Sequence, residues 1–180
     1  MKNLLTKLII PSKSLFVNSG QMFSSLPNDF EPMRKDLFSI EFPVSMGISE
    51  KFLVEASRPK VTNEVKEVKF KQLSTFFKGK TKVNPMKITF RDSIGPGVYS
   101  QLEAWQRQHT DMATGMGGYA ATYKKTLTLN MEDPSGSVVQ KFLLYGCFIT
   151  DLDGGELNQE SDDIALVSMD IQYDSYAKVI

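Results

Sequence analysis

The sequence predicts a mainly β protein: an antiparallel β-sandwich or barrel-like subunit with one capping α-helix and an N-terminal arm. Three observations predict this class. Apolar residues alternate with polar ones in several short runs, which is the period of a strand with one buried face. In the last third of the chain, turn residues separate such runs and no helical period interrupts them. After the N-terminal arm, only residues 96–109 have helical spacing instead.

The last third contains three strand-like runs. In residues 125–131 leucine and methionine alternate with threonine and asparagine, so we expect one buried face. Residues 138–149 are apolar on both faces and should be buried, and residues 164–173 alternate again. The two links are residues 132–136, with a proline and a glycine suited to a turn, and the acidic residues 151–157.

Alternation also predicts strands in the first half of the chain. These are residues 37–42, 52–56, 61–73 and 86–90. The third run is long and its alternation is imperfect, which indicates a bulged strand with one face in water.

The expected helix begins near Pro96, which suits a first helical turn. Val98, Leu102, Trp105 and His109 then form one stripe at helical spacing. A single amphipathic helix in a β-rich chain should cover an open end or face of the sheets.

Composition limits the function classes. The 180 residues suit one domain, and 21 basic against 21 acidic side chains give no net charge. No global field attracts nucleic acid, and little repulsion opposes self-association. The one cysteine, Cys147, should be a buried thiol. Neither a signal peptide nor a membrane-spanning run is expected, so the protein should be cytosolic when made.

Residues 1–34 are predicted to be an N-terminal arm, and residues 35–180 the β domain. The arm is rich in Ser, Asn, Gly and Pro but carries Phe16, Phe23 and Phe30, which a flexible tail would normally lack. It could lie on its own domain or pack on a neighbouring subunit. Phe16 and Phe23 are candidate contacts between subunits.

Residues 74–85 combine paired aromatic residues with lysines, which is unusual for a plain connector. Phe76 and Phe77 could fold onto the core from a hairpin tip. We favour a projecting loop that docks on another chain, with Phe76, Phe77, Lys78 and Lys80 as candidate contacts.

No catalytic, metal or cofactor site is predicted. His109 is the only histidine and has no visible catalytic partner. Gly79-Lys80-Thr81 resembles the end of a P-loop but lacks its first glycine and its strand-to-helix context. Asp151 and Asp153 could open a calcium loop, but the glycine and glutamate that an EF-hand requires are missing. We therefore expect no enzyme.

Five short segments occur in the order found in the tail tube proteins of contractile-tailed bacteriophages, which residues 35–180 resemble. They are Leu37-Phe38-Ser39-Ile40-Glu41, the long connection at residues 76–83, Trp105-Gln106, Tyr123-Lys124-Lys125 and Gly155-Glu156-Leu157. The N-terminal arm is longer than in the shortest members of that family.

The resemblance implies a non-enzymatic subunit of a virion tail, assembled in the host cytoplasm. Such subunits form hexameric rings whose sheets join around a lumen, and the rings stack into a tube that conducts DNA without binding it specifically. The implied partners are further copies of the chain, the sheath, the tape-measure protein, and the baseplate and tail terminator proteins. Joining open sheet edges between copies would also protect them.

Alternatives remain open. The long arm fits a tube-initiating baseplate component, and a tube of an injection system unrelated to phage is a close variant. A calcium- or carbohydrate-binding β-sandwich, with the acidic link as its site, belongs to a different class.

Overall fold

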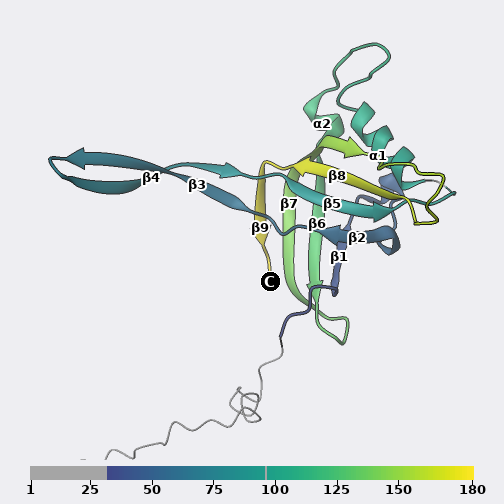
Figure 1. Cartoon of the computed structure of the whole chain (residues 1–180), viewed down its shortest axis with the longest axis horizontal. Helices are drawn as coiled ribbons and strands as arrows, with labels where there is room; N and C mark the ends of the chain where they lie inside the picture. Colours follow the sequence, from purple (N-terminus) through teal and green to yellow (C-terminus); the bar gives the residue numbers. More distant parts are fainter. Residues whose placement is uncertain (1–31, 96) are drawn as a thin grey trace, which may run out of the picture. The chain divides into compact units, whose positions relative to one another are not determined.

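The computed structural model describes residues 32–95 and 97–180 (Figure 1). They belong to the compact unit Arg34–Ile180, apart from two residues before it. The elements are β1 (Phe38–Glu41), the short 3-10 helices η1 (Val44–Met46) and η2 (Glu50–Phe52), β2 (Leu53–Ala56), β3 (Val61–Phe70), β4 (Leu73–Val83), β5 (Met86–Arg91), α1 (Val98–Arg107), α2 (Ala120–Tyr123), β6 (Lys125–Glu132), β7 (Val138–Asp153), β8 (Leu166–Gln172) and β9 (Ser175–Lys178).

Two antiparallel sheets share the long strand β7. Its first half lies between β6 and β9, and β6 also pairs with β1, so the first sheet has the order β1–β6–β7–β9. Its second half pairs with β8, which leads to β5 and β2. Gly146 has a φ of +67° near the change of partner, a conformation that glycine adopts without steric cost.

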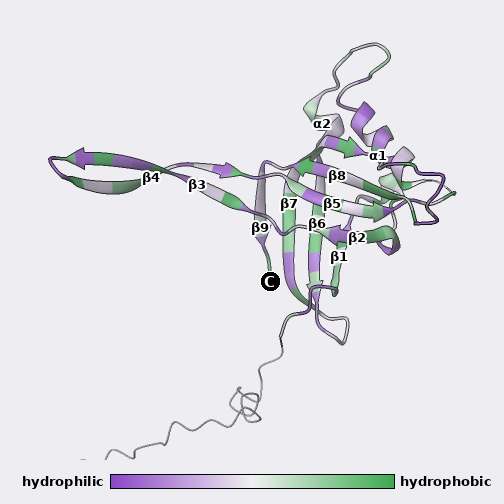
Figure 2. Cartoon of the chain, in the orientation of Figure 1, coloured by the Kyte–Doolittle hydropathy of each residue, from purple (hydrophilic) through white to green (hydrophobic). Residues whose placement is uncertain are grey.

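One hydrophobic core lies between the sheets, and every strand of the two sheets except β9 contributes to it or packs against it. The register explains this, because Met86, Ile88 and Phe90 of β5 are opposite Ile171, Met169 and Val167 of β8. All six side chains are buried, together with Ile40, Leu127, Leu129, Leu144, Cys147, Ile149 and Tyr173. In Figure 2 this region appears as hydrophobic bands on the strands. The expected mainly antiparallel β fold with one main helix is confirmed.

Helix α1 covers this core with three of the four residues of the predicted stripe, whereas His109 lies beyond the end of the helix at Arg107. Val98, Leu102 and Trp105 are buried. The indole Nε1 of Trp105 also donates a hydrogen bond of 2.7 Å to the backbone oxygen of Tyr123, at the end of α2. The short helix α2 falls where the sequence showed no signal.

Several predicted details were wrong. Residues 74–85 were expected to be a loop, but Leu73–Val83 is strand β4. β3 has no buried face, because its whole length is exposed. β7 is not buried throughout: its first residues and Tyr145 are exposed. Strand β9 was not predicted.

Strand β6 was expected to have one buried face, but side chains on both of its faces are buried. Thr128 and Asn130, on the face away from the core, are also buried. Asn130 donates a 2.7 Å hydrogen bond to Glu41 of the neighbouring strand β1. The predicted N-terminal arm lies almost entirely outside the described residues.

Candidate assembly surfaces

The β3–β4 hairpin extends away from the two sheets (Figure 1). β3 and β4 pair only with each other in the described part of the chain. Contacts at the base anchor the hairpin: the amide of Lys60 donates to the Tyr173 hydroxyl at 3.1 Å, and the Gln172 side chain donates to the Val83 carbonyl at 3.2 Å. The hairpin is therefore joined to the core at its base, and its remaining length is open to solvent.

Large apolar side chains occupy both faces of this hairpin. Antiparallel partners share a face, so the pairing Lys66↔Phe77, Val68↔Thr75 and Phe70↔Leu73 defines one face. The pairing Val65↔Lys78 and Glu67↔Phe76 defines the other. The exposed apolar residues of the hairpin beyond its base are Val65, Val68, Phe70, Leu73, Phe76 and Phe77. Figure 2 shows that hydrophobic and hydrophilic segments alternate along the hairpin.

Phe76 and Phe77 lie on opposite faces of β4, and 65% and 56% of their surfaces are exposed. The alternative in which both rings fold onto the core is therefore wrong. The projecting segment is a strand rather than a loop, because it pairs with β3 along its length. Its docking on another chain stays a prediction.

The hairpin is strongly basic. Between residues 61 and 83 there are six lysines, including Lys78 and Lys80, and two glutamates, which gives a net charge of +4. The ion pairs in the described residues involve none of these lysines; they are Arg34–Asp36, Arg107–Glu103 and Lys124–Asp174. These charges are therefore available to a partner.

Gly79 marks a bulge in the hairpin. The register steps from Asn63↔Thr81 to Val65↔Lys78, so β4 gains one residue relative to β3. A Cβ at Gly79 would lie 3.1 Å from the Cβ and the backbone oxygen of Glu64. Such tight approach explains a glycine in mid-strand. The segment that resembled part of a P-loop is therefore a strand bulge.

The sheet β1–β6–β7–β9 ends in two strands that each have one partner in the described chain. Their outer edges thus offer backbone hydrogen-bonding groups to another strand. The face of this sheet away from the core carries Ser39, Glu41, Thr128, Asn130, Glu132, Val138, Lys141, Leu143, Tyr145, Ser175 and Ala177. It is mostly polar, with two acids and one base.

The connection between β7 and β8, residues 154–165, is acidic. Residues 151–166, which include the end of β7, contain six carboxylates and no lysine or arginine. Gly155 fixes the start of the connection: its φ is +74°, and a Cβ there would lie 2.6 Å from the Leu166 oxygen. Its amide also donates to the Asp153 carboxylate at 2.9 Å.

The acidic connection also holds apolar residues. Leu157, Ile164 and Leu166 are exposed. With Gly155, Glu156 and Asp163 they line a hollow of about 300 Å³. In the described residues, no group of three or more His, Cys, Asp or Glu side chains is arranged to hold a metal ion.

His109 and Cys147 are held in structural contacts. The His109 ring contacts the Thr110 hydroxyl at 2.8 Å and the Ile149 carbonyl at 3.1 Å, and it packs edge-on against Tyr123. Cys147 is a free, fully buried thiol, and burial raises its pKa to about 12. A thiol protonated at neutral pH is a poor nucleophile.

Phe16 and Phe23 lie outside the described residues, so their proposed contacts stay predictions. Within the part of the chain that the structure describes, no helix is both long and apolar enough to cross a membrane.

The strand character of β4 was not predicted from the sequence, and the acidic residues 151–157 were considered only as a ligand site, not as a surface for another copy. A signal for β4 was present, because Lys78, Lys80 and Lys82 alternate with small or β-branched residues. The lysines and the glycine suggested a loop and concealed that period.

No family model matches the chain, and no curated protein sequence matches it. Solved structures do match. The sheath/tube terminator of an extracellular contractile injection system, PVC, in its extended state has 13% identity and a TM-score of 0.65, over 84% of this chain and 99% of that chain. A chain of the PVC sheath–tube complex has 14% identity and a TM-score of 0.63, over 91% and 98%. Hcp1 from Flavobacterium johnsoniae has 10% identity and a TM-score of 0.51, over 79% and 94%.

These matches span nearly the whole of each compared chain, so the likeness concerns a complete subunit fold rather than a shared motif. At such low identity it establishes the fold alone. The chain has a tail-tube-like fold, the one found in the tube components of contractile injection systems, as the resemblance in its sequence implied.

Proposed function

We propose that this protein is a non-enzymatic structural subunit of the tube of a contractile tail. One observation carries the proposal: a subunit with a tail-tube-like fold presents six exposed apolar side chains on a hairpin without an intramolecular partner. Such a surface is costly in water unless another molecule covers it. A tube made of many copies provides that cover.

The strand directions suit a ring. In the sheet β1–β6–β7–β9 every pair is antiparallel, so β1 and β9 run in opposite directions. Placing β9 of one copy beside β1 of the next would therefore continue the antiparallel pattern without interruption. A head-to-tail contact of this kind gives a closed ring when its rotation closes. Six copies per ring is the number that the family resemblance implies.

The outer face of this sheet is our candidate for the lumen wall. A channel that passes DNA should not grip it, because each lysine or arginine that neutralises a phosphate adds salt-dependent affinity. Among the residues of that face, Glu41 and Glu132 outnumber Lys141. We therefore propose a weakly acidic or neutral wall, with the hairpin lysines elsewhere.

The partners follow from this role. We propose that stacked copies form the tube, that a sheath surrounds it, that a tape-measure protein fills it, and that baseplate and terminator proteins end it. The N-terminal arm, residues 1–34, would contact another subunit. Its deletion should then weaken assembly more than it lowers the unfolding temperature of the isolated subunit, and the opposite pattern would place the arm on its own domain.

A tube terminator is the second candidate. Two of the matching structures are terminator or cap assemblies, and one is matched over 99% of its chain. A terminator ring would share the fold and the ring contacts but would not continue to stack.

Negative-stain electron microscopy of the purified full chain tests the proposal. Rings and tubes are expected for a tube subunit, and rings that never stack for a terminator. Monodisperse small particles at high concentration would contradict both and would favour the binding-module alternative.

A further inference from the structure

We infer that the β3–β4 hairpin of one copy docks on the acidic end of a second copy, formed by residues 151–166. This inference rests on the proposed self-assembly and names the two surfaces that meet. It identifies the partner of the hairpin as another molecule of the same chain.

The hairpin requires a partner for a physical reason. An isolated two-stranded hairpin is at best marginally stable in water, and stability comes from a covered apolar face. Here Val68, Phe70, Leu73 and Phe77 lie together on one exposed face, and neither sheet of the described unit covers them. Both outer edges of the hairpin also have unpaired backbone groups.

Opposite net charge identifies the acidic end of a second copy as the partner of the hairpin. The hairpin has a net charge of +4, and its lysines form no ion pair within the described residues. Residues 151–166 contain six carboxylates and no base, and those of Glu156, Glu160 and Asp162 have no described ion pair. Complementary charge guides encounter and fixes register between surfaces.

Apolar groups match as well. The acidic end exposes Leu157, Ile164 and Leu166 beside its hollow of about 300 Å³. A hollow of that size can accept an aromatic or leucine side chain from the hairpin. Charge surrounding an apolar centre is the usual composition of a specific interface.

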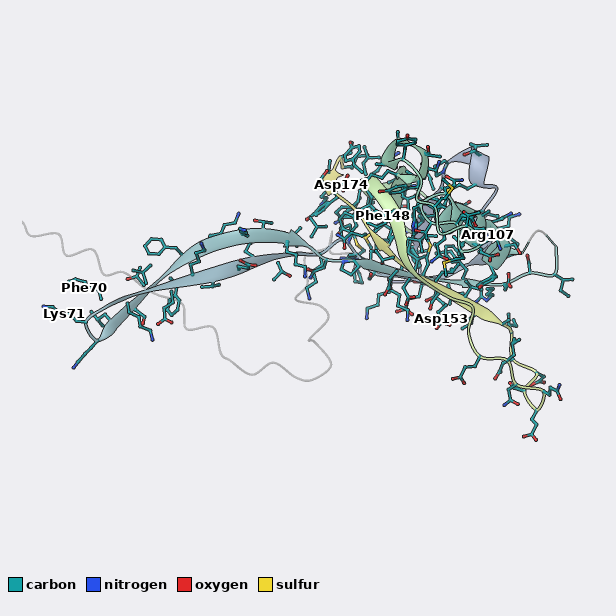
Figure 3. All side chains as sticks on the ribbon, turned by 90° about the horizontal axis from the view of Figure 1, so that it is seen from above. Phe70, Lys71, Arg107, Phe148, Asp153 and Asp174 are labelled. Atoms are coloured by element: carbon teal, nitrogen blue, oxygen red, sulfur yellow. The ribbon has the colours of Figure 1, made fainter. Side chains whose placement is uncertain are left out.

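Position makes the contact intermolecular. Phe70 and Lys71, at the hairpin tip, and Asp153, where the acidic end begins, lie at opposite ends of the described unit (Figure 3). One copy cannot bring its own two surfaces together, so each copy uses its hairpin on one neighbour and its acidic end on another. Such a heterologous contact extends from copy to copy.

Reciprocal charge reversal tests the inference. The hairpin variant carries Lys69→Glu, Lys71→Glu, Lys78→Glu and Lys80→Glu, which change its net charge from +4 to −4. The acidic-end variant carries Glu156→Lys, Glu160→Lys, Asp162→Lys and Asp163→Lys, which change its net charge from −6 to +2. Each alone should lose assembly, because like charges then face each other. An equimolar mixture should recover it, because the reversed hairpin fits the reversed acidic end while the two unchanged surfaces fit each other. The measurement is the sedimenting fraction, with electron microscopy of the pellet.

The matched control is Lys51→Glu with Lys87→Glu, two lysines outside both surfaces, which should assemble as the unmodified chain does. Circular dichroism of each variant checks that it is folded. Zero-length carbodiimide cross-linking of a mixture of ¹⁵N-labelled and unlabelled chains, read by mass spectrometry, should join hairpin lysines to residues 151–163 between differently labelled copies.

The outcomes separate this inference from the proposed function. The inference is overturned if the acidic-end variant assembles normally or if the mixture does not recover assembly. The proposed function still stands in that case if the unmodified chain forms tubes. Hairpin-to-acidic-end cross-links without rings or tubes support the inference and contradict the function. If neither cross-links nor assembly is found, both the inference and the proposed function are overturned. Binding of the hairpin to duplex DNA or anionic vesicles, unaffected by excess acidic-end peptide, also overturns the inference.

Discussion

The β3–β4 hairpin and the β5–β8 pair are both antiparallel ladders with apolar residues in alternation, but their surroundings differ. In the β5–β8 pair, Ile88 and Met169 are opposite each other and fully buried. In the hairpin, Phe70 and Leu73 are opposite each other, and about three quarters of each is exposed. Alternation determines which side chains share a face, but not whether another layer covers that face. The core ladder stabilises the subunit, whereas the hairpin leaves its apolar surface open to solvent, where we propose that another copy covers it.

The largest expected effect concerns assembly. Replacing both Phe76 and Phe77 by serine should leave a folded, soluble subunit and stop tube growth. Burial of a phenylalanine side chain contributes about 1.5–3 kcal/mol, so each contact loses several kcal/mol. Electron microscopy measures tube length, and Ile94→Ser with Tyr119→Ser, two exposed apolar residues outside the hairpin, is the control. Tubes of normal length from the double serine variant would refute the docking role.

The same side chain should behave differently in the core. Phe90→Ala should lower the free energy of unfolding by about 3–5 kcal/mol, because Phe90 is fully buried and its removal leaves a cavity. Phe76→Ala should change the free energy of unfolding of the monomer by less than about 0.5 kcal/mol, as exposed positions do. Urea denaturation of the dilute subunit compares the two. Equal losses would show that the hairpin stabilises its own subunit.

A smaller effect is expected where β7 passes from one sheet to the other. In Gly146→Ala the new Cβ would lie 2.1 Å from Oδ2 of Asp174, and the φ of +67° disfavours any L side chain. Gly136→Ala, in an open turn with a φ of +83°, has the backbone cost alone, about 1–2 kcal/mol. Thermal unfolding should therefore show the larger loss at Gly146. Equal losses would mean that Asp174 moves aside freely.

The smallest effect concerns Cys147 and pH. Its thiol should react slowly with a thiol reagent at pH 8, because burial raises its pKa from 9.0 to about 12. Its contribution to stability is complete below pH 9, where both states are protonated. That contribution declines between pH 9 and 12, where the unfolded chain loses the proton first. Cys147→Ala should remove that part of the alkaline decline. Labelling of the folded protein as fast as of the unfolded chain would contradict this.

Much of the fold could be predicted because local patterns encode it. The buried faces of β5 and β8, the helix stripe from Val98 to Trp105 and the turn after β6 all follow from residue spacing. β9 was missed because four residues are too few to show a period. The burial of Thr128 and Asn130 depends on neighbouring strands, which spacing cannot reveal.

The candidate surfaces were predicted less completely. The projecting position of Phe76 and Phe77 could be predicted, because aromatic residues beside lysines are unusual in a plain connection, and the structure places both on an exposed strand. Val65, Val68, Phe70 and Leu73 could not be recognised as exposed, because the same alternation occurs in buried strands. Only the absence of a covering layer distinguishes them, and that is a property of the tertiary structure.

The pairing of β5 with β8 has a consequence for synthesis of the chain. Met86, Ile88 and Phe90 lack their cross-strand partners until β8 has been made, and about two fifths of the chain lies between the two strands. At about 5–20 residues per second, translation of that part takes several seconds. The strands of the hairpin are adjacent in sequence, so they can begin to pair as soon as both have emerged. The ribosome-bound chain therefore exposes the apolar side chains of the hairpin segment before its core exists, so neighbouring ribosomes on one message are a place where premature contacts between copies can begin.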